Sequence, residues 1–409
     1  MTGFLEGVLC CPDIELGICF PRVGTAGVSE GQADGFCFYS FGPVIKAPEK
    51  YDSAVEEQMK EIIRRFDPDI LHVFGTEFAH SLAAVRAFAR PLATVINIQG
   101  LVSIYARHFM GDVPGWVQRG FTLRDLLRWD NLSIQQKKFV KRGEFEKEAL
   151  RLSGNVIGRT DWDRACSKQM NPDIRYFFLN ETLRDSFYMG KWEIESCDPH
   201  RIFVSLSQAS FPIKGLHYVL EAVRMLAEEF HDIHLYVAGN DITRGFSATF
   251  QDRLKLSIYG KYIIKTIEEY GLRSRVTFLG FCNEQQMKEQ YVSCRVFVSP
   301  STIENESNSV SEAKILGVPV VASFVGGVTG RISHGEDGFL YQHDAPYMLA
   351  YYVRKLFMED ELAGMLSENA RQNAQRLHDR EKNRQRALEI YEQIFEQTGK
   401  GGTHEPKTI

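Results

Sequence analysis

The sequence of 409 residues lacks several features that would assign a protein to a class at once. It has no apolar run of transmembrane length, and its N-terminus lacks the charged segment and apolar core of a signal peptide. Its eight cysteines form no C-x-x-C pair and no metal-ligand spacing with histidine, which favours a reduced, cytoplasmic protein. A net charge of −5 argues against a general nucleic-acid binder.

Strand-length apolar runs alternate with longer helical stretches, which predicts an α/β fold with parallel sheets flanked by helices. The chain exceeds the usual size of one hydrophobic core, so we expect two domains. Predicted strands occupy residues 14–20, 36–40, 70–74, 93–98, 155–158 and 174–178, and then residues 202–206, 233–238, 276–279, 296–298, 318–322 and 339–341. Predicted helices include residues 53–66, 216–230, 261–270, 284–293 and 380–395.

A polar stretch over residues 192–200 separates the two series of strands, and we place the domain boundary there. The predicted organisation is therefore a first domain over residues 1–191 and a second over residues 200–378. A long C-terminal helix over residues 379–397 follows. The polar tail, residues 398–409, is expected to be disordered.

Two glutamates, Glu304 and Glu312, lie on either side of a predicted loop-to-helix junction, with one apolar strand before them and another after them. Eight residues make a little over two helical turns, so the two acids must have different tasks. We expect Glu304 in the loop at the strand's carboxyl end and Glu312 about one turn inside the helix. Open α/β sheets bind ligands at such junctions, and a helix N-terminus favours phosphate.

Lys214 and Gly215 occupy a similar junction after an earlier strand of the same series. A lysine there can neutralise a leaving diphosphate as a point charge, whereas alone it is more often a solvated surface residue. The two glutamates in the same series favour the first interpretation. The pair Gly326-Gly327 follows the next strand and can bring the backbone close to a ligand or merely form a turn.

Asp161 and Asp163 have a D-x-D spacing that can hold a divalent ion. They follow a strand and open a helix, so we favour a capping or first-turn role. In the first domain, His80 and the pair Gln99-Gly100 follow successive predicted strands, whose polar ends are expected to converge on a crevice. His80 can equally be a helix residue with a satisfied ring.

Residues 116–147 mix aromatic and aliphatic side chains with arginines and lysines. A basic amphipathic surface with aromatics can lie on anionic lipid, so peripheral membrane contact through this segment is one hypothesis. The alternative, which we favour here, is a helix packed on the core with a solvated face, because Asp125, Asp130, Glu144 and Glu146 are interleaved with the cations.

Taken together, Lys214-Gly215, Glu304-x₇-Glu312-Ala313, Gly317-Val-Pro-Val-Val-Ala and Gly326-Gly327 resemble the retaining glycosyltransferases of family 4. The resemblance is strong over residues 201–377 and weaker, but collinear, over the first domain. It implies the GT-B architecture, in which two Rossmann-like domains with parallel sheets face each other across a cleft. The C-terminal helix would then cross back onto the first domain.

The resemblance implies a role for each matching residue. Glu312 would hold the ribose hydroxyls of a nucleotide-sugar, Glu304 would contact the donor sugar, and Lys214 would bind the diphosphate. Glu304 and Lys214 are thus the candidate catalytic residues. The other donor-side candidates are Asn305, Glu306, Ser307, Asn308, Gln208 and Cys282, and the candidates on the acceptor or sugar side are His80, Gln99 and Gly100.

The implied reaction transfers a hexose from an NDP-sugar to a glycan or lipid-linked acceptor with retained configuration, by same-face attack with the leaving phosphate as base. It needs no cofactor, catalytic metal or enzyme nucleophile, and the implied place is the cytoplasm or the inner face of the membrane. Two alternatives stay open. One is an NDP-sugar epimerase of similar form, which would need acid and base residues facing the sugar. The other is a catalytically impaired nucleotide-sugar-binding relic.

The sequence departs from the family pattern in four places, and two of these, a missing arginine and a missing opening strand, motivate the alternative of a nucleotide-sugar-binding relic. Ser207, Gln208 and Ala209 stand where the family usually has an arginine before the lysine. Gln99-Gly100 replaces a frequent histidine, and Gly330 replaces a frequent carboxylate. Family members open with a strand, a Gly-rich loop and a helix, whereas this sequence reaches its first clear strand at residue 14. We therefore expect a first domain that lacks its opening strand and a donor crevice open on that side.

Overall fold

The computed structural model describes residues 11, 13–24, 27–33, 35–42, 47–206, 211–247, 249–399 and 407–408. The chain divides into two compact units. Unit 1 comprises Met1–Ala106, Lys138–Thr182 and His378–Ile409, and unit 2 comprises Arg107–Lys137 and Leu183–Leu377. Each unit contains a parallel sheet flanked by helices, which confirms the predicted α/β class.

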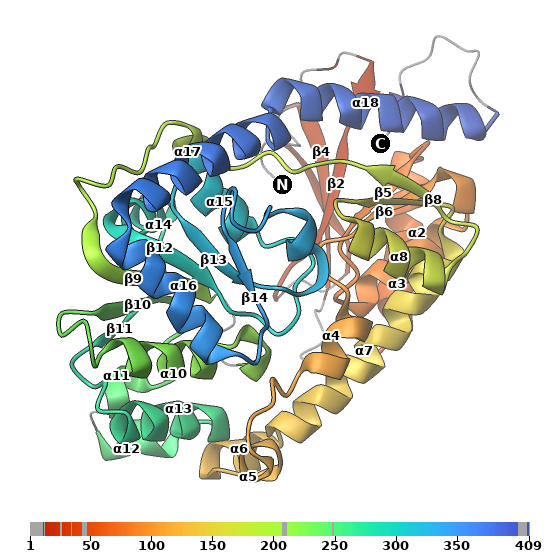
Figure 1. The fold of residues 1–409 in the computed structure, drawn as a ribbon. Helices are drawn as coiled ribbons and strands as arrows, with labels where there is room; N and C mark the ends of the chain where they lie inside the picture. Colours follow the sequence, from red (N-terminus) through yellow and green to blue (C-terminus); the bar gives the residue numbers. More distant parts are fainter. Residues whose placement is uncertain are drawn as a thin grey trace. The chain divides into compact units, whose positions relative to one another are not determined.

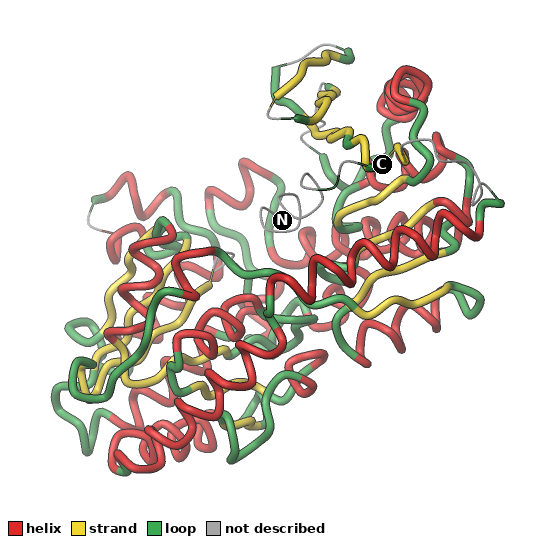
Figure 2. Tube along the Cα trace, turned by 90° about the horizontal axis from the view of Figure 1, so that it is seen from above, coloured by secondary structure: helices red, strands yellow, loops and turns green. Residues whose placement is uncertain are grey.

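The parallel sheet of unit 1 has the order β5-β6-β7-β8. Its strands are β5 (Leu71–Phe74), β6 (Thr94–Asn97), β7 (Asn155–Gly158) and β8 (Arg175–Phe178). Successive side chains point to opposite faces, so Val95 and Ile157 pack in one core cluster and Ile96 and Val156 in another. The long helix α18 (Arg380–Gln397) covers the first of these faces and runs along the strands (Figure 2).

Unit 1 also contains a second, mixed sheet, which includes a strand that the sequence does not predict. Its order is β2-β4-β3, with β2 (Gly17–Pro21) parallel to β4 (Phe36–Phe41) and β3 (Ser29–Ala33) antiparallel to it. The polar composition of β3 gives no strand signal, which is why the sequence does not predict it. The predicted strand at 14–20 is divided, because β1 (Ile14–Glu15) pairs instead with β15 (Lys407–Thr408).

The short strand β15 lies within residues 398–409, the tail expected to be disordered. For Lys407 and Thr408 that expectation is wrong, because they pair with β1. The predicted loss of an opening strand concerns residues 1–13, of which 1–10 and 12 lie outside the described residues. It therefore stays a prediction.

Unit 2 contains a six-stranded parallel sheet in the order β11-β10-β9-β12-β13-β14 (Figure 1). The strands are β9 (Asp198–Leu206), β10 (His234–Gly239), β11 (Val276–Gly280), β12 (Cys294–Ser299), β13 (Val320–Ser323) and β14 (Phe339–Tyr341). All six residues of β12 and all four of β13 are buried, as expected for strands covered on both faces.

The helices of the described residues connect these strands. In unit 1 and the segments that leave it they are α2 (Ser53–Phe66), α3 (Ala79–Phe88), η1 (Pro91–Ala93), α4 (Val102–His108), α7 (Leu132–Leu152) and α8 (Asp161–Met170). In unit 2 they are α5 (Gly115–Arg119), α6 (Leu123–Arg128), α9 (Asp185–Tyr188), η2 (Pro212–Lys214), α10 (Leu216–Leu226), α11 (Arg244–Ser247), α12 (Phe250–Leu254), α13 (Ile258–Glu269), α14 (Glu284–Ser293), α15 (Asn308–Leu316), η3 (Gly326–Gly330), α16 (Pro346–Met358) and α17 (Asp360–Leu377). Of the helices described, none combines the length and apolar character needed to cross a membrane.

Candidate functional site

Three loops meet at the carboxyl edge of the unit 2 sheet, because β9, β12 and β13 are adjacent and parallel. Lys214 lies in η2, after β9, and Glu304 lies in the loop after β12. The Lys214 Nζ and the Glu304 Oε2 form an ion pair at 2.7 Å, and the Ser301 hydroxyl donates to the same oxygen at 3.2 Å. The fold thus places side by side two predicted residues that are far apart in the sequence.

Two glycines allow this close approach. Gly215 has φ +71°, and a Cβ at this position would lie 2.0 Å from the Pro300 carbonyl oxygen. Gly326 has φ +48°, and its Cβ would lie 2.0 Å from the carbonyl oxygen of Glu304, which also accepts a hydrogen bond of 3.1 Å from the Gly327 amide. Both positions therefore exclude side chains, and the Gly326-Gly327 turn buttresses the Glu304 loop.

Helix α15 begins just after this loop. Its first residue is Asn308 and its N-cap is Ser307, whose side chain makes no capping hydrogen bond. The first turn carries no acidic residue, so nothing there offsets the positive end of the helix dipole. Glu304 lies in the loop and Glu312 one turn inside the helix, which confirms the two predicted positions. Asn305 is fully buried, whereas Asn308 is exposed.

The carboxylate of Glu312 is buried but remains hydrogen-bonded. Arg184 donates to its Oε1 from Nη2 at 2.7 Å and from Nε at 3.2 Å, and the Tyr291 hydroxyl donates to its Oε2 at 3.3 Å. Burial raises the pKa of Glu312, and the charge and hydrogen bonds of Arg184 and Tyr291 oppose that rise. Glu312 is therefore easier to protonate than an ordinary glutamate.

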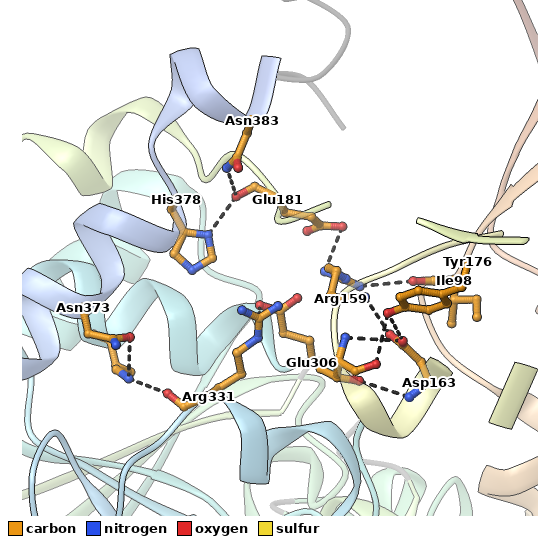
Figure 3. A network of polar contacts seen from close by, with 12 residues as sticks. Ile98, Arg159, Asp163, Tyr176, Glu181, Glu306, Arg331, Asn373, His378 and Asn383 are labelled. Carbon is orange, nitrogen blue, oxygen red and sulfur yellow. Dashed lines mark hydrogen bonds and ion pairs between the residues drawn. The ribbon is translucent and has the colours of Figure 1, made fainter. Parts of the chain in front are cut away.

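Glu306 is a donor-side candidate whose side chain has a structural partner instead. Its carboxylate forms an ion pair at 3.0 Å with the Nε of Arg331, and both side chains are almost fully buried (Figure 3). Lys314, also buried, pairs with Asp337 at 2.8 Å and donates to the Arg331 carbonyl. Burial lowers the pKa of Lys314, and the charge of Asp337 opposes this. Only the backbone of Glu306 is left to face a ligand.

The remaining donor-side candidates are placed as follows. Cys282 lies after β11, is half-buried, and has its Sγ 3.9 Å from the Gly280 carbonyl oxygen. Burial raises the pKa of its thiol. Gln208, with Ser207 and Ala209, lies outside the described residues.

In unit 1, polar groups follow β5, β6 and β7 at one edge of the sheet. Gln99 Nε2 donates to Asn97 Oδ1 at 3.0 Å. Gly100 is buried, and a Cβ there would lie 3.0 Å from the ring of Tyr105. Arg159, after β7, is buried; it pairs with Glu181 at 2.9 Å and its guanidinium reaches the Ile98 carbonyl at 3.4 Å (Figure 3).

His80 lies at the start of α3 in an apolar setting. Its ring stacks on Phe78 with centroids 5.5 Å apart and meets Phe41 edge-on at 5.6 Å. It lines a cavity of about 230 Å³ with Pro48, Val55 and other mostly apolar residues of unit 1. Burial lowers the pKa of His80 to about 4, so its imidazole is neutral near pH 7.

The D-x-D pair has the helix-start role favoured from the sequence. Thr160 is the N-cap of α8, Asp161 lies in its first turn, and Asp163 completes a capping box. The two Asp163 oxygens also accept from the Tyr176 hydroxyl at 2.6 Å and from the Arg159 amide at 2.9 Å (Figure 3). Among the described residues, no group of three or more His, Cys, Asp or Glu is placed to hold a metal ion.

Sequence reasoning missed Arg184 and Tyr291, the partners of Glu312, and Arg331, the partner of Glu306. Arg184 is 128 residues from Glu312 and precedes the predicted domain boundary, so no local pattern links them. Arg331 follows Gly330 in the chain, and no local pattern in the sequence pairs it with Glu306.

Replacing Arg331 by methionine is predicted to destabilise unit 2 by about 3–5 kcal/mol, because it leaves the Glu306 charge buried and unpaired. Urea unfolding measures the loss. The double variant Arg331→Met/Glu306→Gln should recover part of it. As a control, Arg354→Met breaks a half-exposed pair with Glu229 and should cost less than about 1 kcal/mol. Equal losses in the two single variants would contradict a buried, coupled pair.

Residues 192–373 match the protein family described as Glycosyl transferases group 1. An uncharacterized glycosyltransferase of Methanocaldococcus jannaschii is 27% identical over 46% of this chain and 44% of its own length. The D-inositol 3-phosphate glycosyltransferase of Corynebacterium urealyticum is 27% identical over 44% of this chain and 41% of its own length. The chain thus spans less than half the length of these curated relatives.

Solved structures extend the similarity of fold to both units. Sucrose-phosphate synthase from Thermosynechococcus elongatus matches with a TM-score of 0.68 and 16% identity, over 93% of this chain and 89% of that one. HepE of Anabaena, solved with UDP-glucose, matches with a TM-score of 0.59 and 18% identity, over 81% of each chain. The chain therefore has the GT-B fold of these glycosyltransferase structures, and its residues 192–373 are similar to the group 1 glycosyl transferases.

Proposed function

We propose that this chain is a retaining glycosyltransferase that moves a hexose from an NDP-sugar to a glycan or lipid-linked acceptor. The observation that carries the proposal is the Lys214–Glu304 ion pair at the carboxyl edge of the unit 2 sheet. The pair lies just before the N-terminus of α15, in the stretch that matches the family. The HepE structure with UDP-glucose supports a nucleotide-sugar as the donor class.

The diphosphate of the donor would bind between Lys214 and the start of α15. The backbone amides of Asn305, Glu306 and Ser307 lead into a helix whose N-cap side chain makes no capping bond. Backbone amides at a helix N-terminus and the helix dipole favour a phosphate group there. Because the Glu306 side chain is held by Arg331, its charge does not oppose the diphosphate directly.

Glu312 would bind the two ribose hydroxyls. An ionised carboxylate can accept from both, and charge-assisted bonds of this kind are stronger than neutral ones. Arg184 opposes the rise in the pKa of the buried carboxylate and fixes one oxygen, while Tyr291 fixes the other. We propose that both partners orient Glu312 and that the ribose hydroxyls donate to the lone pairs that its carboxylate has left.

Glu304 would contact hydroxyls of the donor sugar, and Lys214 would offset the charge that grows on the diphosphate as it leaves. The acceptor would attack from the same face as the leaving phosphate, which takes its proton. We assign the acceptor or sugar side to His80, Gln99 and Gly100 in unit 1. His80 is neutral near pH 7, so it can exchange a hydrogen bond with a sugar hydroxyl without adding charge.

Product analysis tests this function. The protein is incubated with UDP- and GDP-hexoses, with and without glycan and polyprenyl-linked acceptors, and the anomeric configuration of the products is read by NMR. Transfer or donor hydrolysis with retained configuration is expected. Isomerised sugar would instead indicate an epimerase, and binding without turnover would indicate a nucleotide-sugar-binding relic.

Glu312→Gln is predicted to weaken binding of the nucleoside diphosphate, because charge-assisted bonds to the ribose contribute roughly 1.5–3 kcal/mol each. Calorimetric titration measures the affinity, and Glu289→Ala, which removes an exposed carboxylate on α14, is the matched control. Since the pKa of Glu312 is raised, acidification should protonate it early and lower wild-type affinity more steeply than that of the Gln variant. Parallel pH profiles of affinity for the wild type and the Gln variant would contradict the assignment of Glu312 to the ribose.

Lys214→Ala is predicted to lower kcat by about 10²–10³-fold and to raise the donor KM much less, because the lysine acts where transition-state charge develops. Steady-state kinetics with saturating acceptor separates the two effects. The control, Lys191→Ala, removes an exposed lysine of the same unit. A defect confined to KM would show ground-state binding instead.

Transfer is also predicted to survive EDTA, because the lysine and the start of α15 supply the positive charge that a metal ion would otherwise provide. Activity is compared before and after chelation and dialysis. Loss of activity that Mn²⁺ or Mg²⁺ restores would contradict this mechanism.

A further inference from the structure

Residues 114–131, here called the α5–α6 hairpin, expose an unusual number of large apolar side chains. Six of them lie within fourteen positions: Trp116, Phe121, Leu123, Leu126, Leu127 and Trp129. Leu127 is 78% and Trp129 65% exposed, and the rings of Phe121 and Trp129 lie 6.1 Å apart. Such a cluster is more than the scattered surface apolar residues of an ordinary protein, and it marks a surface that contacts something apolar.

The hairpin is fixed in place, so its exposure does not come from fraying. A capping box of Thr122 and Asp125 starts α6, and both residues also bond to a distant segment of the same unit. The Thr122 hydroxyl donates to the Leu256 carbonyl at 2.7 Å, and the buried Asp125 carboxylate accepts from the Ile258 amide at 2.9 Å. Val117 is fully buried on the same side. One side of the hairpin, which is formed by α5 and α6 (Figure 1), is therefore anchored, while the other presents its apolar side chains to solvent.

For residues 116–131 this arrangement corrects the favoured interpretation of a core-packed helix with a solvated face, whereas Phe145, farther along the segment, packs against the core as expected. Val117 and Leu132 do pack inside, but the exposed side carries the tryptophans and leucines. The acid Asp125, which weighed against lipid contact in the sequence, is buried and paired with Arg124 at 2.8 Å.

The charge around the hairpin selects the partner. Residues 114–137 contain four cations and two carboxylates, and one of those carboxylates is buried. Arg119, Arg128 and Lys137 are exposed. The whole chain has a net charge of −5. An anionic surface therefore attracts this cationic segment and repels the rest of the chain, which orients the protein on that surface. Tryptophan with flanking lysine and arginine is the pattern of the lipid interface, and lysine is depleted at protein–protein interfaces.

We propose that the α5–α6 hairpin inserts its exposed apolar side into the interfacial layer of an anionic lipid membrane. Leu126, Leu127 and Trp129 enter the boundary between headgroups and acyl chains, and Arg128 and Lys137 contact lipid phosphates. The proposal goes beyond the sugar-transfer function and does not use the donor site. Its failure is therefore separate from any failure of the proposed activity.

Vesicle co-sedimentation of the full chain tests this. Wild type should bind vesicles that contain phosphatidylglycerol and bind phosphatidylcholine vesicles far more weakly. Leu126→Ser/Leu127→Ser should weaken binding about tenfold or more, from the lost apolar burial. Arg128→Glu/Lys137→Glu should weaken it about tenfold or more and flatten its salt dependence. The matched control, Tyr347→Ser/Tyr351→Ser, removes two exposed aromatics on α16 and should bind as wild type.

Tryptophan fluorescence separates insertion from adsorption. A blue shift on adding anionic vesicles, diminished in Trp129→Phe, supports insertion. Binding without a shift, equal binding to neutral vesicles, or no binding by wild type would each overturn the proposal. A concentration-dependent dimer without vesicle binding would also overturn it, if Leu126→Ser/Leu127→Ser abolished that dimer. The hairpin would then be an interface between copies of this chain.

Discussion

The close approach of three strand-end loops in unit 2 is the constraint on which the proposed donor site depends. Parallel strands bring β9, β12 and β13 to one edge, but the loops interlock only because Gly215 and Gly326 have no side chain. A Cβ at either position would lie 2.0 Å from a backbone oxygen of the neighbouring loop. Backbone packing therefore brings together the loops that carry Lys214 and Glu304, whose side chains form an ion pair at 2.7 Å.

Three glutamates within nine positions show how environment divides tasks among identical side chains. Glu304 shares a lysine at the sheet edge, Glu306 is buried against Arg331, and Glu312 is buried with Arg184 and Tyr291. Glu304 is near solvent, Glu306 has a structural role in its buried ion pair, and Glu312 has a raised pKa. In the proposed mechanism these states correspond to sugar contact, loop support and ribose binding.

Much of this could be predicted because the signals are local. The periodic apolar runs predicted α2, α14, β7 and β14 to the residue. The order of motifs placed Lys214 and Glu304 in loops of one sheet edge. The rest depends on contacts between distant segments: Arg184 reaches Glu312 across 128 residues, β15 pairs with β1, and β3 has no apolar pattern of its own. The sequence left an exposed amphipathic surface over residues 116–147 as one of two hypotheses, and it could not show that Asp125, one of the acids counted against lipid contact, is buried.

The most direct test of the donor site is a thermal-shift screen of the full chain with UDP- and GDP-sugars and the free diphosphates. A ligand at 100 times its Kd stabilises the native state by about 2.7 kcal/mol. The account predicts a rise in melting temperature with the nucleotide-sugars of at least one base and with its free diphosphate, and none with the sugar alone. No shift with any of these nucleotides at about millimolar concentration would contradict it.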